Sequence, residues 1–190
     1  MIGHRDLVRS MERLFRRAGL RLGMSEGFHP KPRMSFPLAL AVGIEGLDEV
    51  MELELAESCT AEELDRRLAR HALPGLTFSS IEVLSPGDKK ARIRSASYRI
   101  VVPPDRLAEA TARVAELCSS PQWLVQREGK PAPVDFRPDL ESLAVQDGVV
   151  SMRLCGREGG AGPRDVLAAL GLSDLEEQGV CLTRTQVELQ

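Results

Sequence analysis

The chain has 190 residues, of which 43% are apolar and 28% are charged, and its net charge is −3. These proportions are typical of a soluble globular protein and exclude a collagen-like repeat, a wholly disordered chain and a disulfide scaffold. No apolar run approaches the roughly 18 residues of a membrane-spanning helix, and the opening MIGHRDLVRS contains no apolar signal core. We therefore expect a cytoplasmic protein with no membrane partner.

The charge is distributed in blocks. Residues 1–37 contain eight basic and three acidic residues, a net charge of +5, and residues 86–103 carry +4. The intervening and following segments, 38–85 and 104–190, carry −7 and −5. Basic stretches on an acidic body favour a local anionic ligand over general coating of nucleic acid, although charge balance between neighbouring elements gives the same pattern.

An amphipathic helix is predicted over residues 5–18. Leu7, Met11 and Leu14 fall on one side at 100° per residue, and Gly19 follows as a helix stop. The opposite side carries five basic residues within an arc of about 120°, and they are Arg5, Arg9, Arg13, Arg16 and Arg17. This face is a candidate phosphate-binding surface; the alternative is an ordinary solvated face.

The segment GMSEGFHPKPRMSF, residues 23–36, predicts a shaped loop that leads into a strand over about 34–42. Prolines 30 and 32 hold their predecessors extended, and glycines 23 and 27 allow tight bends. Binding residues concentrate on such loops, and the candidates here are Ser25, His29, Lys31 and Arg33. The alternative is a rigid connection with Phe28 tucked into the core.

Six further elements follow a regular pattern up to residue 118. Strict alternation predicts a strand over 50–56, a capping box at Thr60 begins a helix over 60–72, and 76–84 forms another strand. The basic, Pro- and Gly-containing segment 86–96 is a linker. A strand over 97–103 and a helix over 104–118 open the second half.

The remaining elements are strands over 122–128, 140–146, 149–155 and 180–189, with a short helix over 163–170. Asp147 and Gly148 predict a hairpin turn between the second and third of these strands. The chain is thus α+β, with two ferredoxin-like (βαββαβ-type) modules and antiparallel sheets. The first module, residues 1–85, lacks its opening strand and leaves an open sheet edge, and the second spans 97–190. Either the chain starts at a downstream Met, or another segment fills this gap.

A glycine-rich loop, GREGGAGPRD, precedes the helix over 163–170. Its backbone N–H groups and the helix start suit an anion, but it is not a Walker A loop. We expect a second anion pocket here, with a plain mobile loop as the alternative. The candidate residues are Gly159, Gly160, Gly162 and Arg164.

Catalytic and metal chemistry have weaker support in the sequence. The four cysteines are isolated, so neither a zinc site nor an iron–sulfur cluster is predicted, and we expect no metal or cofactor in this chain. His29, with His4 as a second candidate, is the alternative acid–base residue, and Ser25 lies near it in sequence. Contact between His29 and phosphate is favoured over catalysis, and a structural role for His29 is the further alternative.

The first 55 residues carry a specific resemblance to a known family. The residues that carry it include the HRD segment at 4–6, the arginine-rich run ERLFRRAG at 12–19 and SEGFHPKP at 25–32; weaker matches are SASYRI at 95–100 and VDFRP at 134–138. The chain resembles the DUF2344 family of bacterial proteins, also called radical-SAM-linked proteins. The resemblance implies a partnership with a radical S-adenosylmethionine iron–sulfur protein and a link to RNA modification.

Together these features favour a non-catalytic accessory protein that presents RNA, either tRNA or rRNA, to a radical S-adenosylmethionine enzyme. Two alternatives remain open. One is an RNA-processing enzyme, a nuclease or transferase, that uses His29. The other is a protein-interaction module that docks through the open sheet edge.

Overall fold

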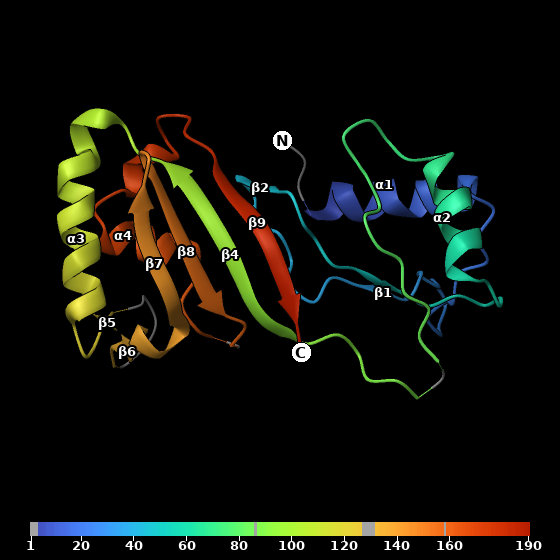
Figure 1. Cartoon of the computed structure of the whole chain (residues 1–190). Coiled ribbons are helices and arrows are strands. Elements are labelled where there is room, and N and C mark those ends of the chain that lie inside the picture. The colour runs from blue at the N-terminus through green and yellow to red at the C-terminus, as the bar shows by residue number, and fades with distance from the viewer. Residues whose placement is uncertain (1–3, 86, 127–131, 158) are drawn as a thin grey trace. The chain divides into compact units, whose positions relative to one another are not determined.

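The computed structural model describes residues 4–85, 87–126, 132–157 and 159–190 (Figure 1). The chain forms two compact units, the first from Met1–Val42 and Met51–Ala91, and the second from Gly43–Val50 and Arg92–Gln190. The segment 43–50, which the sequence placed in the first module, is therefore grouped with the second unit. The two units are described separately below.

Two helices and a small apolar core form the centre of the first unit. Helix α1 (His4–Arg17) and helix α2 (Ala61–Ala69) share a core made of Met11, Leu14, Phe15, Ala18, Leu20, Leu64 and Leu68. Each Leu, Met or Phe side chain of this core stabilises the fold by about 1.5–3 kcal/mol when it is removed from water. Helix α1 ends at Gly19, whose φ of 68° closes a Schellman turn in which the Leu20 N–H donates to the Phe15 carbonyl at 3.0 Å. The Thr60 hydroxyl accepts from the Glu63 N–H at 3.2 Å and begins α2 as predicted.

Strand pairing in the first unit is much shorter than the sequence predicts. Strand β1 (Met34–Ser35) pairs antiparallel with β3 (Glu52–Leu53), two residues in place of the expected 34–42 and 50–56. Pro37 follows β1 and has no N–H to continue a ladder. The expected strand over 76–84 is absent; Phe78 and Ile81 pack on the helical core instead.

The second unit contains a five-stranded mixed sheet. In chain order its strands are β2 (Ile44–Gly46), β4 (Ile93–Val101), β7 (Leu140–Gln146), β8 (Val149–Cys155) and β9 (Leu182–Leu189). They lie in the order β2-β9-β4-β8-β7, with β2 parallel to β9 and the other neighbours antiparallel (Figure 1). Positive φ angles at Asp147 and Gly148 close the predicted β7–β8 hairpin.

Helices line this sheet, and the alternation of its strands places the core. Helix α3 (Leu107–Ser119) follows a short turn η1 (Pro104–Arg106) and contacts β7, and α4 (Pro163–Ala169) lies behind β7 and β8 in Figure 1. Along β8, Val150, Met152 and Leu154 are buried, whereas Ser151 between them is exposed. One face of the sheet is thus the core face.

Two strands of this unit differ in their bounds from the sequence expectation. Strand β4 begins at Ile93, inside the predicted linker 86–96. The predicted strand over 122–128 is reduced to β5 (Leu124–Val125), which pairs with β6 (Val134–Asp135) apart from the main sheet; residues 127 and 128 lie outside the described residues. Two short turns, η2 (Arg137–Asp139) and η3 (Ser173–Leu175), complete the unit. The α+β class is confirmed.

An ion pair fixes the segment 43–50 to the sheet. Arg184 of β9 is only 2% exposed, and its Nε donates to Glu49 Oε1 at 2.8 Å while Nη2 contacts the other carboxylate oxygen. Burial alone would lower the pKa of Arg184, but hydrogen bonds with Glu49 and Tyr98 outweigh it and raise that pKa. The Asp48 carboxylate accepts from the Val187 N–H at 3.1 Å.

Candidate functional site

Helix α1 presents an exposed row of arginines. Its apolar residues face the core, which places Arg5, Arg9, Arg13 and Arg16 on the opposite side, where all four are exposed. We call these four residues the arginine face. No ion pair joins any of them to another residue within the described ranges.

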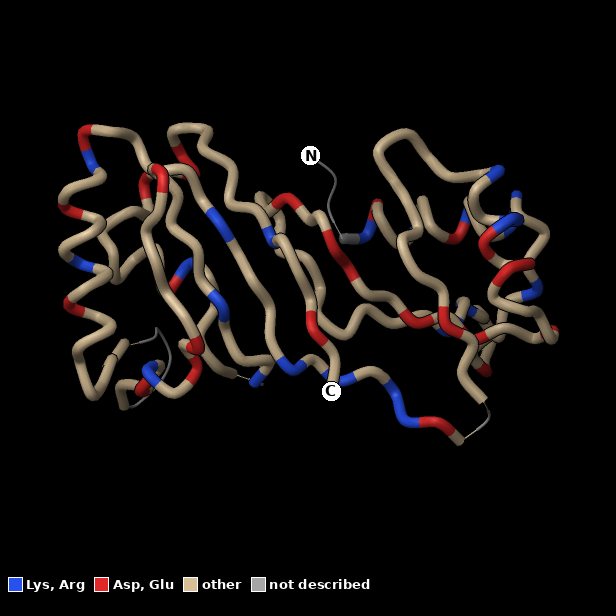
Figure 2. Tube along the Cα trace, in the orientation of Figure 1, with Lys and Arg blue, Asp and Glu red and all other residues tan. Residues whose placement is uncertain are grey.

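Basic residues of the second unit behave differently. Figure 2 shows both blue and red positions on its sheet. Arg153 forms an ion pair with Glu141 at 2.8 Å, and Arg94 pairs with Glu188 at 3.0 Å. These basic side chains therefore pair with acidic groups of the same unit, which fits the alternative of charge balance between neighbouring elements. The arginine face forms no such pairs within the described residues.

The loop after α1 is held closed by reciprocal hydrogen bonds. The Ser25 N–H donates to the Lys31 carbonyl at 2.8 Å, and the Lys31 N–H donates to Ser25 Oγ at 2.9 Å. An isolated bridge between Met24 and Pro32 extends this closure. Gly27 has a φ of 115°, which only glycine adopts readily, at the bend. Ser25 is thus a structural hydrogen-bonding group, and residues 26–30 form the exposed tip.

A shallow open pocket connects this loop to α1. Its volume is about 290 Å³, and Lys31 and Pro32 line it together with Val8 and Glu12 of α1. Further lining comes from Met34, Ser35, Phe36 and Ala39. Glu12 lies three residues after Arg9 and four before Arg16, so all three are neighbours on the helix surface. The structure therefore places Lys31 beside the same flank of α1 that carries the arginine face.

Two predicted phosphate ligands instead contact the protein. The Arg17 guanidinium donates to the His71 carbonyl at 3.2 Å. Arg33 forms an ion pair with Glu54 at 3.2 Å, and both side chains are about half exposed, so the pair contributes little stability. Among the residues predicted for this site, those left for a ligand within the described structure are Arg9, Arg13, Arg16, His29 and Lys31.

Of the two histidines proposed for catalysis, the described structure shows the side chain of His29 alone. His29 is exposed on the loop tip and is absent from the pocket lining. Its neighbour Ser25 accepts from the Lys31 N–H, as described above. His4 is the first residue of α1, and its side chain lies outside the described part of the structure.

The glycine-rich loop of the second unit already holds an anion, which is the protein's own Asp139. This carboxylate is 1% exposed as a residue, accepts from the Ala161 N–H at 2.8 Å and pairs with Arg157 at 2.7 Å. A Cβ at Gly160 would lie 2.9 Å from Asp139 Oδ2, which explains the glycine there.

The helix start beyond this loop is similarly engaged. The Gly162 N–H donates to Asp165 Oδ2 at 2.7 Å, and Arg164 makes a bidentate pair with Glu176 at 2.8 and 2.9 Å. Gly159, on the exposed part of the loop, has a φ of 71°. The Ala161 and Gly162 N–H groups and the Arg164 guanidinium thus contact carboxylates of the protein itself at the predicted second anion pocket.

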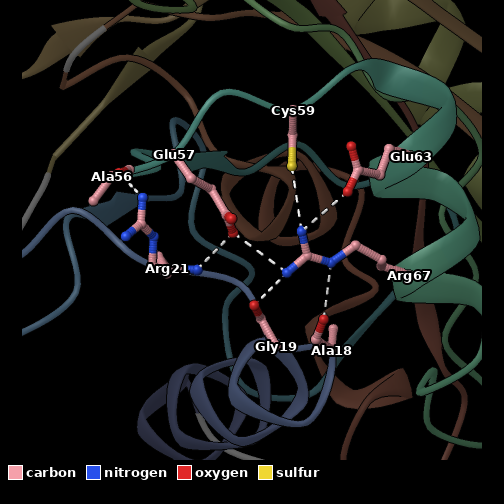
Figure 3. Close-up of polar contacts among 8 residues, drawn as sticks. All are labelled: Ala18, Gly19, Arg21, Ala56, Glu57, Cys59, Glu63 and Arg67. Atoms are coloured by element: carbon pink, nitrogen blue, oxygen red, sulfur yellow. Dashed lines mark hydrogen bonds and ion pairs between the residues drawn. The ribbon is translucent and has the colours of Figure 1, made fainter.

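The sequence analysis missed the polar centre of the first unit, which surrounds Arg67 (Figure 3). From α2, Arg67 donates to the carbonyls of Ala18 and Gly19 at the end of α1 and pairs with Glu57 at 3.3 Å. A cation at a helix C-terminus is favourable because the helix dipole is negative there. The spacing of 49 residues between Arg67 and Ala18 offers no sequence signal for this contact.

Metal and membrane features are addressed by two structural findings. Within the described ranges, no group of three His, Cys, Asp or Glu side chains is placed to hold a metal ion. In the same part of the chain, no helix is long and apolar enough to cross a membrane.

These observations define a two-unit α+β protein with a basic helical surface and a rigid neighbouring loop. The model of one family, described as an uncharacterized protein conserved in bacteria (DUF2344), matches residues 1–163, and the chain belongs to this family. No curated protein matches the chain.

Proposed function

We propose that this protein is a non-catalytic, RNA-binding accessory protein that presents tRNA or rRNA to a radical S-adenosylmethionine enzyme. The observation that carries the proposal is the arginine face, exposed and without ion pairs in the described structure, beside the closed loop that carries Lys31.

Like charges repel one another along the arginine face; Glu12, beside Arg9 and Arg16, offsets part of this repulsion, and a bound polyanion relieves more of it. Arg9 and Arg13, like Arg13 and Arg16, are neighbours on the helix surface, and such like-charge pairs destabilise a helix by about 0.2–0.5 kcal/mol each. From Arg5 to Arg16 the helix rises about 16 Å, which spans roughly five phosphates of one strand. A phosphate chain relieves the repulsion at every position, whereas a single small anion relieves it at one.

The radical enzyme as partner is supported by the resemblance described above and by the cysteines. Cys59, Cys118, Cys155 and Cys181 are free, and the sequence contains no CxxxCxxC run for a cluster. An iron–sulfur centre must then be supplied by the partner, while this chain supplies substrate contacts.

The alternative of an RNA-processing enzyme has less support. A nuclease or transferase of this type needs a base within hydrogen-bond reach of its reacting group. His29 lies on an exposed tip, and the nearby hydroxyl of Ser25 already accepts a backbone hydrogen bond. We therefore assign His29 to phosphate or base contact.

We also infer that the second unit is a ferredoxin-like module that acts as a scaffold. Its elements β4, α3, β7, β8, α4 and β9 follow the strand–helix–strand–strand–helix–strand sequence, and the order β9-β4-β8-β7 is antiparallel throughout. For the first unit, the ferredoxin-like plan and the missing opening strand remain predictions.

The proposal is tested by filter binding of a tRNA transcript and an rRNA fragment as salt is varied. Three to four phosphate contacts predict that log K falls with log salt at a slope of about −3, or roughly 50-fold between about 50 and 200 mM salt. Absence of binding at low salt, or a flat salt response, contradicts the RNA proposal. Co-purification with the radical enzyme tests the partner separately.

A further inference from the structure

Phe28 differs from the other aromatic residues of the chain in its exposure. Phe15, Phe136, Trp123 and Tyr98 are buried, and Phe36 and Phe78 are partly buried against the core. Phe28 is fully exposed at the tip of the closed loop. The interpretation that Phe28 is tucked into the core is therefore wrong.

The loop holds this ring out on a stiff support. The two hydrogen bonds between Ser25 and Lys31 close its base, and Pro30 and Pro32 limit the backbone on one side of the tip. The Arg33 N–H donates to the Gly23 carbonyl at 2.8 Å, which continues the pairing below. Little conformational entropy is then lost when the ring meets a ligand, so its contact area is converted efficiently into affinity.

The residues near the ring in sequence include one cation and one carboxylate. Lys31 lies three residues after Phe28 and forms no ion pair within the described residues, while Glu26 is the only carboxylate of the described tip and His29 adds an imidazole. Lys31 also lines the pocket against α1, next to the arginine face. A flat apolar ring beside phosphate-binding cations matches a nucleotide, which joins a π-face to a phosphate.

We propose that Phe28 is a stacking platform for an unpaired base, so that the protein recognises single-stranded RNA, such as a loop or an end, over duplex. In a duplex the base faces are covered by their neighbours, and Phe28 gains nothing from it. In a single strand, one base stacks on Phe28 while the flanking phosphates meet Lys31 and the arginine face. This inference rests on the proposed RNA function and adds the class of RNA.

The test is fluorescence anisotropy of the full chain with a labelled mixed-sequence RNA strand, alone and annealed to its complement. Wild type is expected to bind the single strand more tightly than the duplex. Phe28→Ala and Phe28→Leu should weaken single-strand binding about tenfold and leave duplex binding unchanged. Phe28→Trp should retain it, and Met24→Ala, which removes another exposed apolar side chain beside the loop, should have no effect.

The outcomes separate this inference from the function on which it rests. If wild type binds neither RNA, the proposed function fails. If wild type binds RNA and Phe28→Ala binds the single strand equally well, the stacking role is overturned and the RNA function stands. If Phe28→Ala retains RNA binding but loses co-purification with the radical enzyme, Phe28 is a protein contact, which also overturns the inference.

Discussion

At the residue scale, Arg67 is the main polar link between the two helices of the first unit. It caps the end of α1, contacts Cys59 Sγ at 3.3 Å and pairs with Glu57, which in turn accepts from the Arg21 N–H at 2.8 Å (Figure 3). One guanidinium thereby satisfies helix carbonyls and orders the segment that precedes α2. In the described part of the chain, no ion pair of this kind holds the arginine face of α1.

Replacing Arg67 with Ala should lower the free energy of unfolding by about 2 kcal/mol, because charge-assisted hydrogen bonds to two orphan carbonyls are lost. Urea unfolding measures this change. Arg66→Ala, at an exposed neighbour on the same helix, is the matched control and should change stability by less than about 0.5 kcal/mol. Equal effects of the two substitutions would show that the cap is unimportant.

The same cluster predicts a pH dependence. A hydrogen bond from the Arg21 backbone N–H, and then the charge and hydrogen bonding of Arg67, hold the pKa of Glu57 below its usual value of 4.5. Since the folded-state pKa is the lower one, the stabilisation is complete above pH 4.5 and is lost as the pH falls through the lowered pKa.

Glu57→Gln should accordingly be less stable than wild type at pH 7, and the difference should shrink as the pH falls below 4.5. Urea unfolding at a series of pH values gives both curves. A difference that stays constant down to pH 2 would mean that Glu57 stabilises the fold without its charge.

At the scale of elements, the helices and one hairpin could be predicted from the sequence. The strand partners that lie far apart along the chain could not be predicted. The apolar spacing of α1 and the capping box of α2 are local signals, as is the Asp147–Gly148 turn. The pairing of residues 44–46 with β9 joins positions almost 140 residues apart, so no local pattern indicates it. The segment 76–84 has a strand-like composition but forms no strand, because composition does not specify a partner.

The buried pair between Glu49 and Arg184 gives a direct test of this long-range pairing. Glu49→Ala leaves a buried guanidinium without its carboxylate and should cost about 3–5 kcal/mol of unfolding free energy. Glu177→Ala, at an exposed site, is the control and should be nearly neutral. If Glu49→Ala is equally neutral in chemical unfolding, the segment 43–50 does not depend on the ion pair.

For the candidate site, the sequence predicted which residues of α1 are exposed but could not show which basic residues have partners elsewhere in the chain. Arg9, Arg13 and Arg16 are exposed as the helical spacing predicts. Arg17 and Arg33 have internal partners that lie more than 20 residues away along the chain. The glycine-rich loop was expected to bind an anion through its backbone N–H groups. One of these groups donates to the buried carboxylate of Asp139, which lies on a separate turn, and no local sequence pattern indicates this contact.

At the scale of the whole molecule, a net charge of −3 coexists with a basic surface on α1 that forms no ion pair within the described residues. The acidic surplus elsewhere repels phosphate and disfavours unspecific coating of the protein with nucleic acid. Under the proposed function, we therefore expect binding to be confined to α1 and its neighbouring loop. The central claim of this account is that the position of these arginines, and not total charge, determines RNA binding.

The most direct measurement compares the salt dependence of RNA binding for two variants with the same net charge. One variant replaces Arg9, Arg13 and Arg16 with Gln. The other replaces Lys89, Lys90 and Arg92 with Gln, and these three residues are exposed in the basic segment 86–103. The first variant should bind weakly with a slope shallower by about 2–3, whereas the second should bind as wild type does. Equal losses in both variants would contradict the claim, because total charge alone would then account for binding.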